Sequence, residues 1–184
     1  MVRFVFLLLF VIAFGSAALT LRDCSGRVST DEAIPQQQAE KIAVLQDGSV
    51  MFAPDGTVTR ALTDWLEQPD EKARWFELGG TQFLGRSVEP TAFTEKRLPK
   101  LEQMLKAYPK VKASLVGHTG VTDDIQDDQR LSTARAEWAR HWLIAAGTSA
   151  RRLTASGAGS SHPLFANRSS QAGRNERVTL QLSF

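Results

Sequence analysis

The sequence predicts an α/β (α+β) sandwich in which helices pack on one side of a mixed β-sheet, after an apolar N-terminal segment. Apolar and polar residues alternate with the period of a half-buried strand at 110–117 and again at 177–184. Between these runs, Leu131, Ala134, Trp138 and other apolar residues up to 145 recur at helical spacing. Strands and helices that alternate along the chain, each with one apolar face, predict helices layered on a sheet.

Length and composition exclude several classes of protein. The 184 residues, 42% hydrophobic and 23% charged, fit one globular domain with a short extra segment. Lys and Arg number 22 against 20 Asp and Glu, a balance that argues against a nucleic-acid partner. One cysteine and three histidines provide no zinc-site spacing, and no phosphate-binding glycine loop occurs, so we expect no metal and no cofactor.

The N-terminus predicts contact with a membrane. Residues 1–21 carry Arg3 and then no other charged side chain. They form either a signal peptide, cleaved after the small residues at 16–18, or a retained signal-anchor transmembrane helix. Lipidation of Cys24 is disfavoured because two charged residues precede it. Both alternatives place the rest of the chain in the cell envelope, facing the periplasm, either membrane-anchored or exported.

Two short segments precede the main domain. Residues 22–41 are polar and predict a linker. In residues 42–74, two apolar runs flank an Asp-Gly turn and a short helix follows, which predicts a small accessory β/α segment. We expect Trp65 and Trp75 to be buried anchors that pack this segment on the main domain.

The main domain is predicted to span residues 75–184. A strand is expected at 75–83, followed by a helix from the N-cap Thr94 to Ala107. Pro99 is expected to bend the first turn of this helix and delay its regular part, because proline lacks a backbone donor. The remaining elements are a strand ending at 117, the long helix, a short strand near 153–156, and a half-buried strand at the C-terminus.

Several motifs occur in order along this domain: 76–83, 105–109, Gly117-His118-Thr119, 131–136, 152–159, Pro163, Asn167 and Asn175-Glu176-Arg177-Val178. In order and spacing they resemble the OmpA-like C-terminal domain, which associates with peptidoglycan in envelope proteins. The resemblance implies a non-catalytic, Gram-negative cell-envelope protein that binds the peptidoglycan stem peptide and tethers or positions an envelope component. An enzyme is not expected, because Ser160-Ser161-His162 lacks a nucleophile-elbow pattern.

The resemblance also implies the site residues. That family recognises diaminopimelate, which carries an ammonium and a carboxylate on one carbon. Arg135 occupies the position of the arginine that holds the carboxylate by paired hydrogen bonds. The expected aspartate directly follows Thr119, and here that residue is Gly120; Leu84 also replaces an acidic residue. The second interpretation is therefore a module with a degenerate pocket that binds another envelope protein in the periplasm.

Thr119 and three charged residues are further candidates for the peptidoglycan-binding site. Asp123, three residues after Gly120, could turn inward to replace the lost carboxylate, or it could belong to a solvated acidic loop that favours the helix dipole. Asp128 could cap the long helix and neutralise Arg135. Arg177 on the last strand is expected to brace the helix that carries Arg135. The aspartates do not fit a calcium loop, because no glycine stands at the required offset.

Overall fold

The computed structural model describes residues 41–184. The predicted apolar segment 1–21 and the linker up to residue 40 lie outside the described residues. Within the described part, no helix combines the length and the apolar character needed to cross a bilayer.

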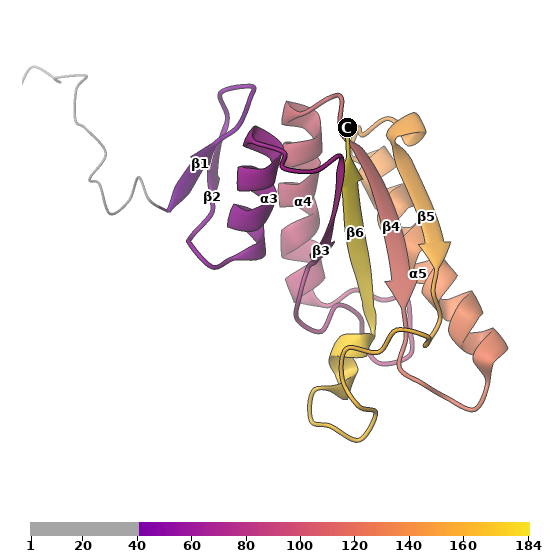
Figure 1. Ribbon diagram of the computed structural model, residues 1–184. Coiled ribbons are helices and arrows are strands. Elements are labelled where there is room, and N and C mark those ends of the chain that lie inside the picture. Colours follow the sequence, from indigo (N-terminus) through magenta and orange to yellow (C-terminus); the bar gives the residue numbers. More distant parts are fainter. Residues whose placement is uncertain (1–40) are drawn as a thin grey trace, which may run out of the picture. The chain divides into compact units, whose positions relative to one another are not determined.

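A mixed four-stranded sheet forms the centre of the main domain. Its strands lie in the order β3 (Ala73–Glu77), β6 (Arg177–Ser183), β4 (Lys112–His118) and β5 (Leu153–Gly157). β6 is antiparallel to both of its neighbours, whereas β4 and β5 are parallel. Helices α4 (Ala92–Ala107) and α5 (Ile125–Ala145) lie behind the sheet in Figure 1. The predicted α/β layer arrangement is confirmed.

The segment before β3 contains a hairpin of β1 (Ile42–Val44) and β2 (Val50–Phe52), followed by α3 (Val58–Glu67). Trp65 on α3 is 2% exposed, and its ring lies 5.9 Å from that of Phe76. The expectation that Trp75 is buried is wrong, because its side chain is 54% exposed. Successive strand residues point to opposite faces, so Phe76 faces the helices and Trp75 cannot.

The predicted strand at 75–83 is too long. β3 ends at Glu77, because Gly79 and Gly80 adopt positive φ angles of 70° and 67° that turn the chain away from the sheet. Phe83 keeps only an isolated bridge to Pro90.

Helix α4 begins earlier than predicted. Its N-cap is Thr91, while Thr94 lies inside the helix and its hydroxyl donates to the Gln82 carbonyl oxygen at 2.7 Å. Pro99 lies within the continuous helix and does not delay its start. Tertiary contact with residue 82 therefore determines the position of Thr94.

The buried face of α5 is shifted by about one residue from the apolar face that the helical spacing predicts. Ser132, Ala136, Ala139 and Leu143 are buried, whereas Leu131 and Trp138 are only partly covered. Glycines of the sheet are the reason, because a Cβ at Gly117 would lie 1.9 Å from the Ser132 carbonyl oxygen. Small residues on both surfaces let helix and strand backbones approach closely.

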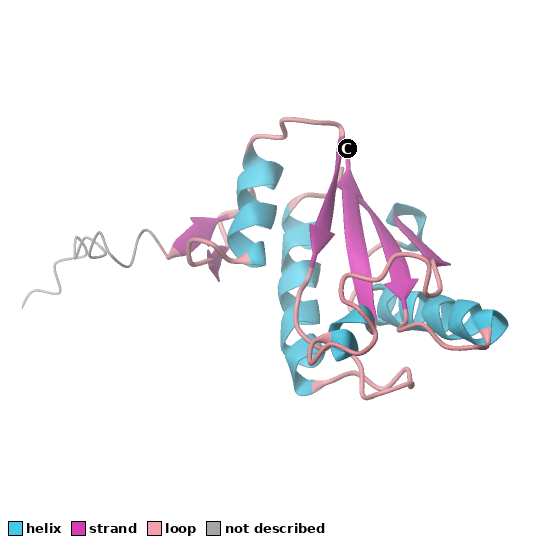
Figure 2. Cartoon of the chain, turned by 60° about the horizontal axis from the view of Figure 1, so that its bottom comes forward, coloured by secondary structure: helices cyan, strands magenta, loops and turns pink. Residues whose placement is uncertain are grey.

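Strand β6 is central, not half-buried as predicted. Val178, Leu180 and Leu182 face the helices and are at most 3% exposed. On the opposite face Arg177 and Thr179 are also buried, because the loop between β5 and β6 passes in front of the strands in Figure 2. The 3-10 helix η1 (Ala150–Arg152) directly precedes β5, and η2 (Ala172–Asn175) lies at the end of this connection.

Candidate functional site

The candidate site lies where β4 ends and the chain enters α5. Residues 119–124 form the connection, and the segment 84–90 lies beside it. Arg135, which projects from α5, has an exposed fraction of 0%. A guanidinium without water contact needs protein acceptors for its donors.

Each guanidinium nitrogen of Arg135 has an acceptor. Nε donates to the Ser87 carbonyl oxygen at 2.9 Å, and Nη2 donates to that of Gly85 at 2.8 Å. Nη1 donates to the His118 carbonyl oxygen at 3.1 Å and to Oε2 of Glu176. Burial lowers the pKa of Arg135, whereas the hydrogen bond and charge of Glu176 raise it. Arg135 therefore remains a cation that is held within the protein.

Glu176 is the site residue that the sequence analysis missed. Its Oε2 pairs with Arg135, and its Oε1 accepts a hydrogen bond from the Gly120 amide at 2.9 Å. A Cβ built on Gly120 would lie 3.1 Å from that same Oε1. The carboxylate of Glu176 thus lies in contact with the position where a side chain of residue 120 would begin. The available signal was an acidic residue inside the Asn175-Glu176-Arg177-Val178 motif.

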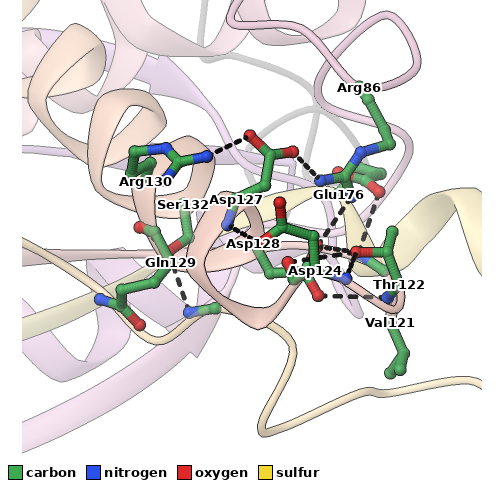
Figure 3. Close-up of polar contacts among 12 residues, drawn as sticks. Arg86, Val121, Thr122, Asp124, Asp127, Asp128, Gln129, Arg130, Ser132 and Glu176 are labelled. Carbon is green, nitrogen blue, oxygen red and sulfur yellow. Dashed lines mark hydrogen bonds and ion pairs between the residues drawn. The ribbon is translucent and has the colours of Figure 1, made fainter.

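Asp128 neither caps α5 nor neutralises Arg135. The N-cap of α5 is Asp124, whose side chain accepts from the Asp127 amide. Asp128 is fully buried and accepts from the amide and hydroxyl of Thr122, while its Oδ1 lies 3.0 Å from Nη1 of Arg86 (Figure 3). Burial raises the pKa of Asp128, but hydrogen bonds from Ser160 and Thr122 outweigh it and lower the pKa overall.

Arg86 joins the segment 84–90 to the start of α5. Besides Asp128, it contacts Asp127, with Nη2 2.6 Å from Oδ2 (Figure 3). The hydrogen bond to Asp127 raises the pKa of Arg86. Because Arg86 lies between Gly85 and Ser87, these ion pairs hold the two carbonyls that cover Arg135.

Of the remaining predicted residues, Thr119 lies beside the Arg135 site, between the His118 carbonyl and the Gly120 amide, whereas Asp123 and Arg177 point elsewhere. Asp123 is exposed on the connecting loop. Thr119 is buried and its amide donates to the Gly159 carbonyl oxygen at 3.0 Å. Arg177 does not brace α5, since it points to the helix-free face of the sheet and donates to Oε2 of Glu77 at 3.0 Å. Among residues 41–184, no three His, Cys, Asp or Glu side chains are grouped to hold a metal ion.

His118 lies opposite Arg177 on the same helix-free face. It is 6% exposed, and its Nε2 lies 3.1 Å from the Thr179 hydroxyl. Burial lowers the pKa of His118 from 6.5 to about 4, and the charges of Arg177 and His162 act in the same direction. The imidazole is therefore neutral at pH 7.

The low pKa of His118 predicts a loss of stability in mild acid. Between pH 6.5 and about 4 the unfolded chain protonates this imidazole and the folded chain does not, so the stabilisation present above pH 6.5 is lost as pH falls. We expect His118 to account for a loss of about 3 kcal/mol in the free energy of unfolding by pH 4. Urea unfolding at pH 7, 5.5 and 4 measures it. In His118→Gln the free energy of unfolding should fall less between pH 7 and pH 4. An equal fall in the variant and the parent chain would contradict the assignment to His118.

Comparison with known proteins gives the family. A sequence model of the OmpA family matches residues 82–177, just over half of the chain. The probable lipoprotein YiaD of Escherichia coli is 32% identical over 87 residues, which are 47% of this chain and 40% of that protein. The match thus covers less than half the length of this relative.

Two solved structures share the fold. The periplasmic domain of Helicobacter pylori MotB is 20% identical, with a TM-score of 0.54 over 78% of this chain and 87% of that one. The cell wall anchor of the type VI secretion system of Pseudomonas aeruginosa is 20% identical, with a TM-score of 0.50 over 69% of this chain and 96% of that one. Because the family model covers most of the main domain, including the segment with Arg135 and Glu176, the chain belongs to the OmpA family.

Proposed function

We propose that this chain, a non-catalytic member of the OmpA family, binds the stem peptide of peptidoglycan and tethers or positions an envelope component. The similar structures are named as a periplasmic domain and a cell wall anchor, and the E. coli relative as a lipoprotein. These names support a domain that faces the periplasm and is held to, or exported across, a membrane by residues 1–21. Residues 22–41 would be its linker, residues 42–74 its accessory segment, and residues 75–184 its binding domain.

The ion pair between Arg135 and Glu176 is the observation that carries the proposal. Diaminopimelate presents an ammonium and a carboxylate on one carbon, and its recognition needs a cation and an anion side by side. Arg135 supplies the cation, and Glu176 supplies the carboxylate that Gly120 lacks. The negative charge that the family pattern places after Thr119 is thus supplied by the residue that precedes β6.

Binding would replace one ion pair by two. In the free protein Arg135 and Glu176 neutralise each other. A zwitterion between them would accept hydrogen bonds from the guanidinium through its carboxylate and donate to Glu176 through its ammonium. No charge would be left buried and unpaired, which is the condition for placing a charged ligand in this site. The carbonyls of Gly85 and Ser87 would have to release the guanidinium.

The second candidate function is a protein-binding module without a cell-wall ligand. The observation in its favour is the complete burial of Arg135 beneath residues 85–87, fastened by Arg86. If these contacts do not open, no ligand reaches the guanidinium. Sedimentation with purified sacculi separates the two functions, because only the first predicts that the full-length chain pellets with peptidoglycan.

The role of the Glu176 carboxylate can be tested by moving the carboxylate from residue 176 to residue 120. We expect Glu176→Gln to lower sacculus binding by at least about tenfold, because the ammonium loses its charged partner. Gly120→Asp alone should also weaken binding, since its carboxylate would lie against Glu176. The double variant with both changes should recover binding, because it restores one carboxylate beside Arg135. Co-sedimentation of the full-length chain measures all three.

Glu137→Gln is the matched control, because Glu137 on α5 pairs with Arg140, an ion pair separate from that of Arg135 and Glu176. It should bind sacculi like the parent chain. Circular dichroism must show each variant folded at the assay temperature. Equal binding by Glu176→Gln and the parent chain would overturn the role of Glu176.

A further inference from the structure

A hollow lies on the face of the sheet that carries no helix. It has a volume of about 640 Å³. Three strands form its floor, and the loop after β5 forms one wall; its main side chains are Trp75, Glu77, His118, His162, Arg177 and Thr179. The strand register explains why they gather, since His118 lies opposite Arg177, and Thr179 lies opposite Glu77. Arg135 projects from α5 on the other side of the sheet, so its guanidinium does not line this hollow, although it donates to the backbone carbonyl of His118.

Two buried polar atoms in this hollow have no hydrogen-bond partner among the described residues. They are Nδ1 of His118, a residue 6% exposed, and Nη1 of Arg177, a residue 4% exposed. Buried polar atoms are normally paired, so an unpaired donor and an unpaired acceptor in one hollow indicate a missing ligand group. This pair is independent of the features used to propose stem-peptide binding.

The hydrogen-bond network assigns the role of each atom. The Thr179 hydroxyl donates to the Val116 carbonyl oxygen at 3.3 Å, so it accepts from Nε2–H of His118 at 3.1 Å. The neutral imidazole then carries no proton on Nδ1, which is an acceptor. Nη1 of Arg177 is a donor, because a guanidinium has no acceptor. A ligand must therefore supply one donor and one acceptor, the pattern of a secondary amide.

The charge and the shape of the hollow restrict the class of ligand further. Arg177 is already balanced by Glu77, so the hollow favours a neutral group over an anion. Trp75, at 54% exposed, offers an aromatic face at the rim, and Pro163 and Leu164 add apolar surface. A flat apolar face beside polar groups suits a sugar ring, whose C–H bonds lie on its faces and whose hydroxyls lie on its edge. Glu77, with one carboxylate oxygen bonded to Arg177, can accept from such a hydroxyl.

We propose that this hollow binds an N-acetylated amino sugar, with the acetamido group between His118 and Arg177 and the ring against Trp75. The acetamido N–H donates to Nδ1 of His118, and its carbonyl oxygen accepts from Nη1 of Arg177. The exposed side chain of His162 turns aside to admit the group. A peptide fits less well, because a chain of amides would need several donor and acceptor pairs where the hollow offers one.

The test is isothermal titration of the full-length chain with triacetylchitotriose. We expect saturable binding, no binding of the deacetylated trisaccharide, and at least about tenfold weaker binding by Trp75→Ala. Trp75 is largely exposed, so this variant should fold. Phe52→Ala is the control, because Phe52 is 58% exposed on β2 and lies outside the hollow. It should bind like the parent chain.

Two variants distinguish a failure of saccharide binding in this hollow from a failure of stem-peptide binding at Arg135. Glu176→Gln should keep saccharide binding, and Trp75→Ala should keep the binding of free diaminopimelate. Absence of binding at millimolar triacetylchitotriose, equal binding of the deacetylated sugar, or binding unaffected by Trp75→Ala would each overturn the proposal. Trp75-dependent binding of a stem tetrapeptide in place of the sugar would overturn it as well.

Discussion

Arg135→Ala is expected to lower the free energy of unfolding by about 3–5 kcal/mol, because it leaves a largely buried carboxylate without its cation. Glu176 loses the partner of its Oε2. The carbonyls of Gly85, Ser87 and His118 lose a donor at the same time. Each buried acceptor without a partner adds to the cost. Urea or thermal unfolding of the full-length chain measures the change.

Arg130→Ala is the matched control for this experiment. Arg130 is on the same helix, its side chain is 66% exposed, and it pairs only loosely with Asp127. Its replacement should change stability by less than about 1 kcal/mol. A loss of similar size in both variants would contradict the buried role of Arg135. Because Arg135→Ala is expected to be less stable than the parent chain, its sacculus binding must be measured below the melting temperature of the variant.

Gly117→Ala should cost about 3 kcal/mol, because the added methyl group meets helix backbone that cannot move alone. Its Cβ would lie 1.9 Å from the carbonyl oxygen of Ser132 and 2.7 Å from the carbonyl carbon. Helix α5 would have to move away from β4, which disturbs the packing of Ala136 and Leu143. Denaturant unfolding measures the loss, and a shifted α5 would also displace Arg135.

Gly173→Ala provides the comparison. A Cβ there would meet only the Thr81 hydroxyl, at 4.0 Å, and Gly173 has no positive φ. This variant should unfold within about 0.5 kcal/mol of the parent chain. If Gly117→Ala were equally mild, the close approach of α5 and β4 described here would be wrong.

Periodicity was sufficient to predict the layers but not the details of the helix contact. The alternation at 110–117 correctly predicts β4, and Gly147 follows the end of α5 as expected. The buried face of α5 was misassigned because tryptophans dominate a hydrophobicity pattern. Contact with glycines such as Gly117 instead selects small side chains such as Ser132. The preference for small side chains depends on the distance between the backbones of α5 and β4, which the sequence pattern of the helix alone does not give.

The candidate site was predicted only in part. The family resemblance selects Arg135, which the structure buries within an ion-pair and carbonyl network. It does not reveal Glu176, because its partnership with Gly120 joins residues 56 positions apart. Asp128 was assigned to Arg135 from nearness in sequence, yet its partner is Arg86 from before α4. Such pairings follow from the tertiary fold and not from local spacing.

The most direct test of the central claim is titration of the 15N-labelled full-length chain with meso-diaminopimelate, observed at the Arg135 Nε–H signal. If Arg135 and Glu176 together form the zwitterion site, this signal shifts saturably with the ligand. The shift should disappear in Glu176→Gln, and pimelate, which lacks the ammonium groups, should not produce it. An Arg135 signal that does not respond at millimolar ligand, in a chain shown to be folded, would contradict the account and favour the protein-binding module.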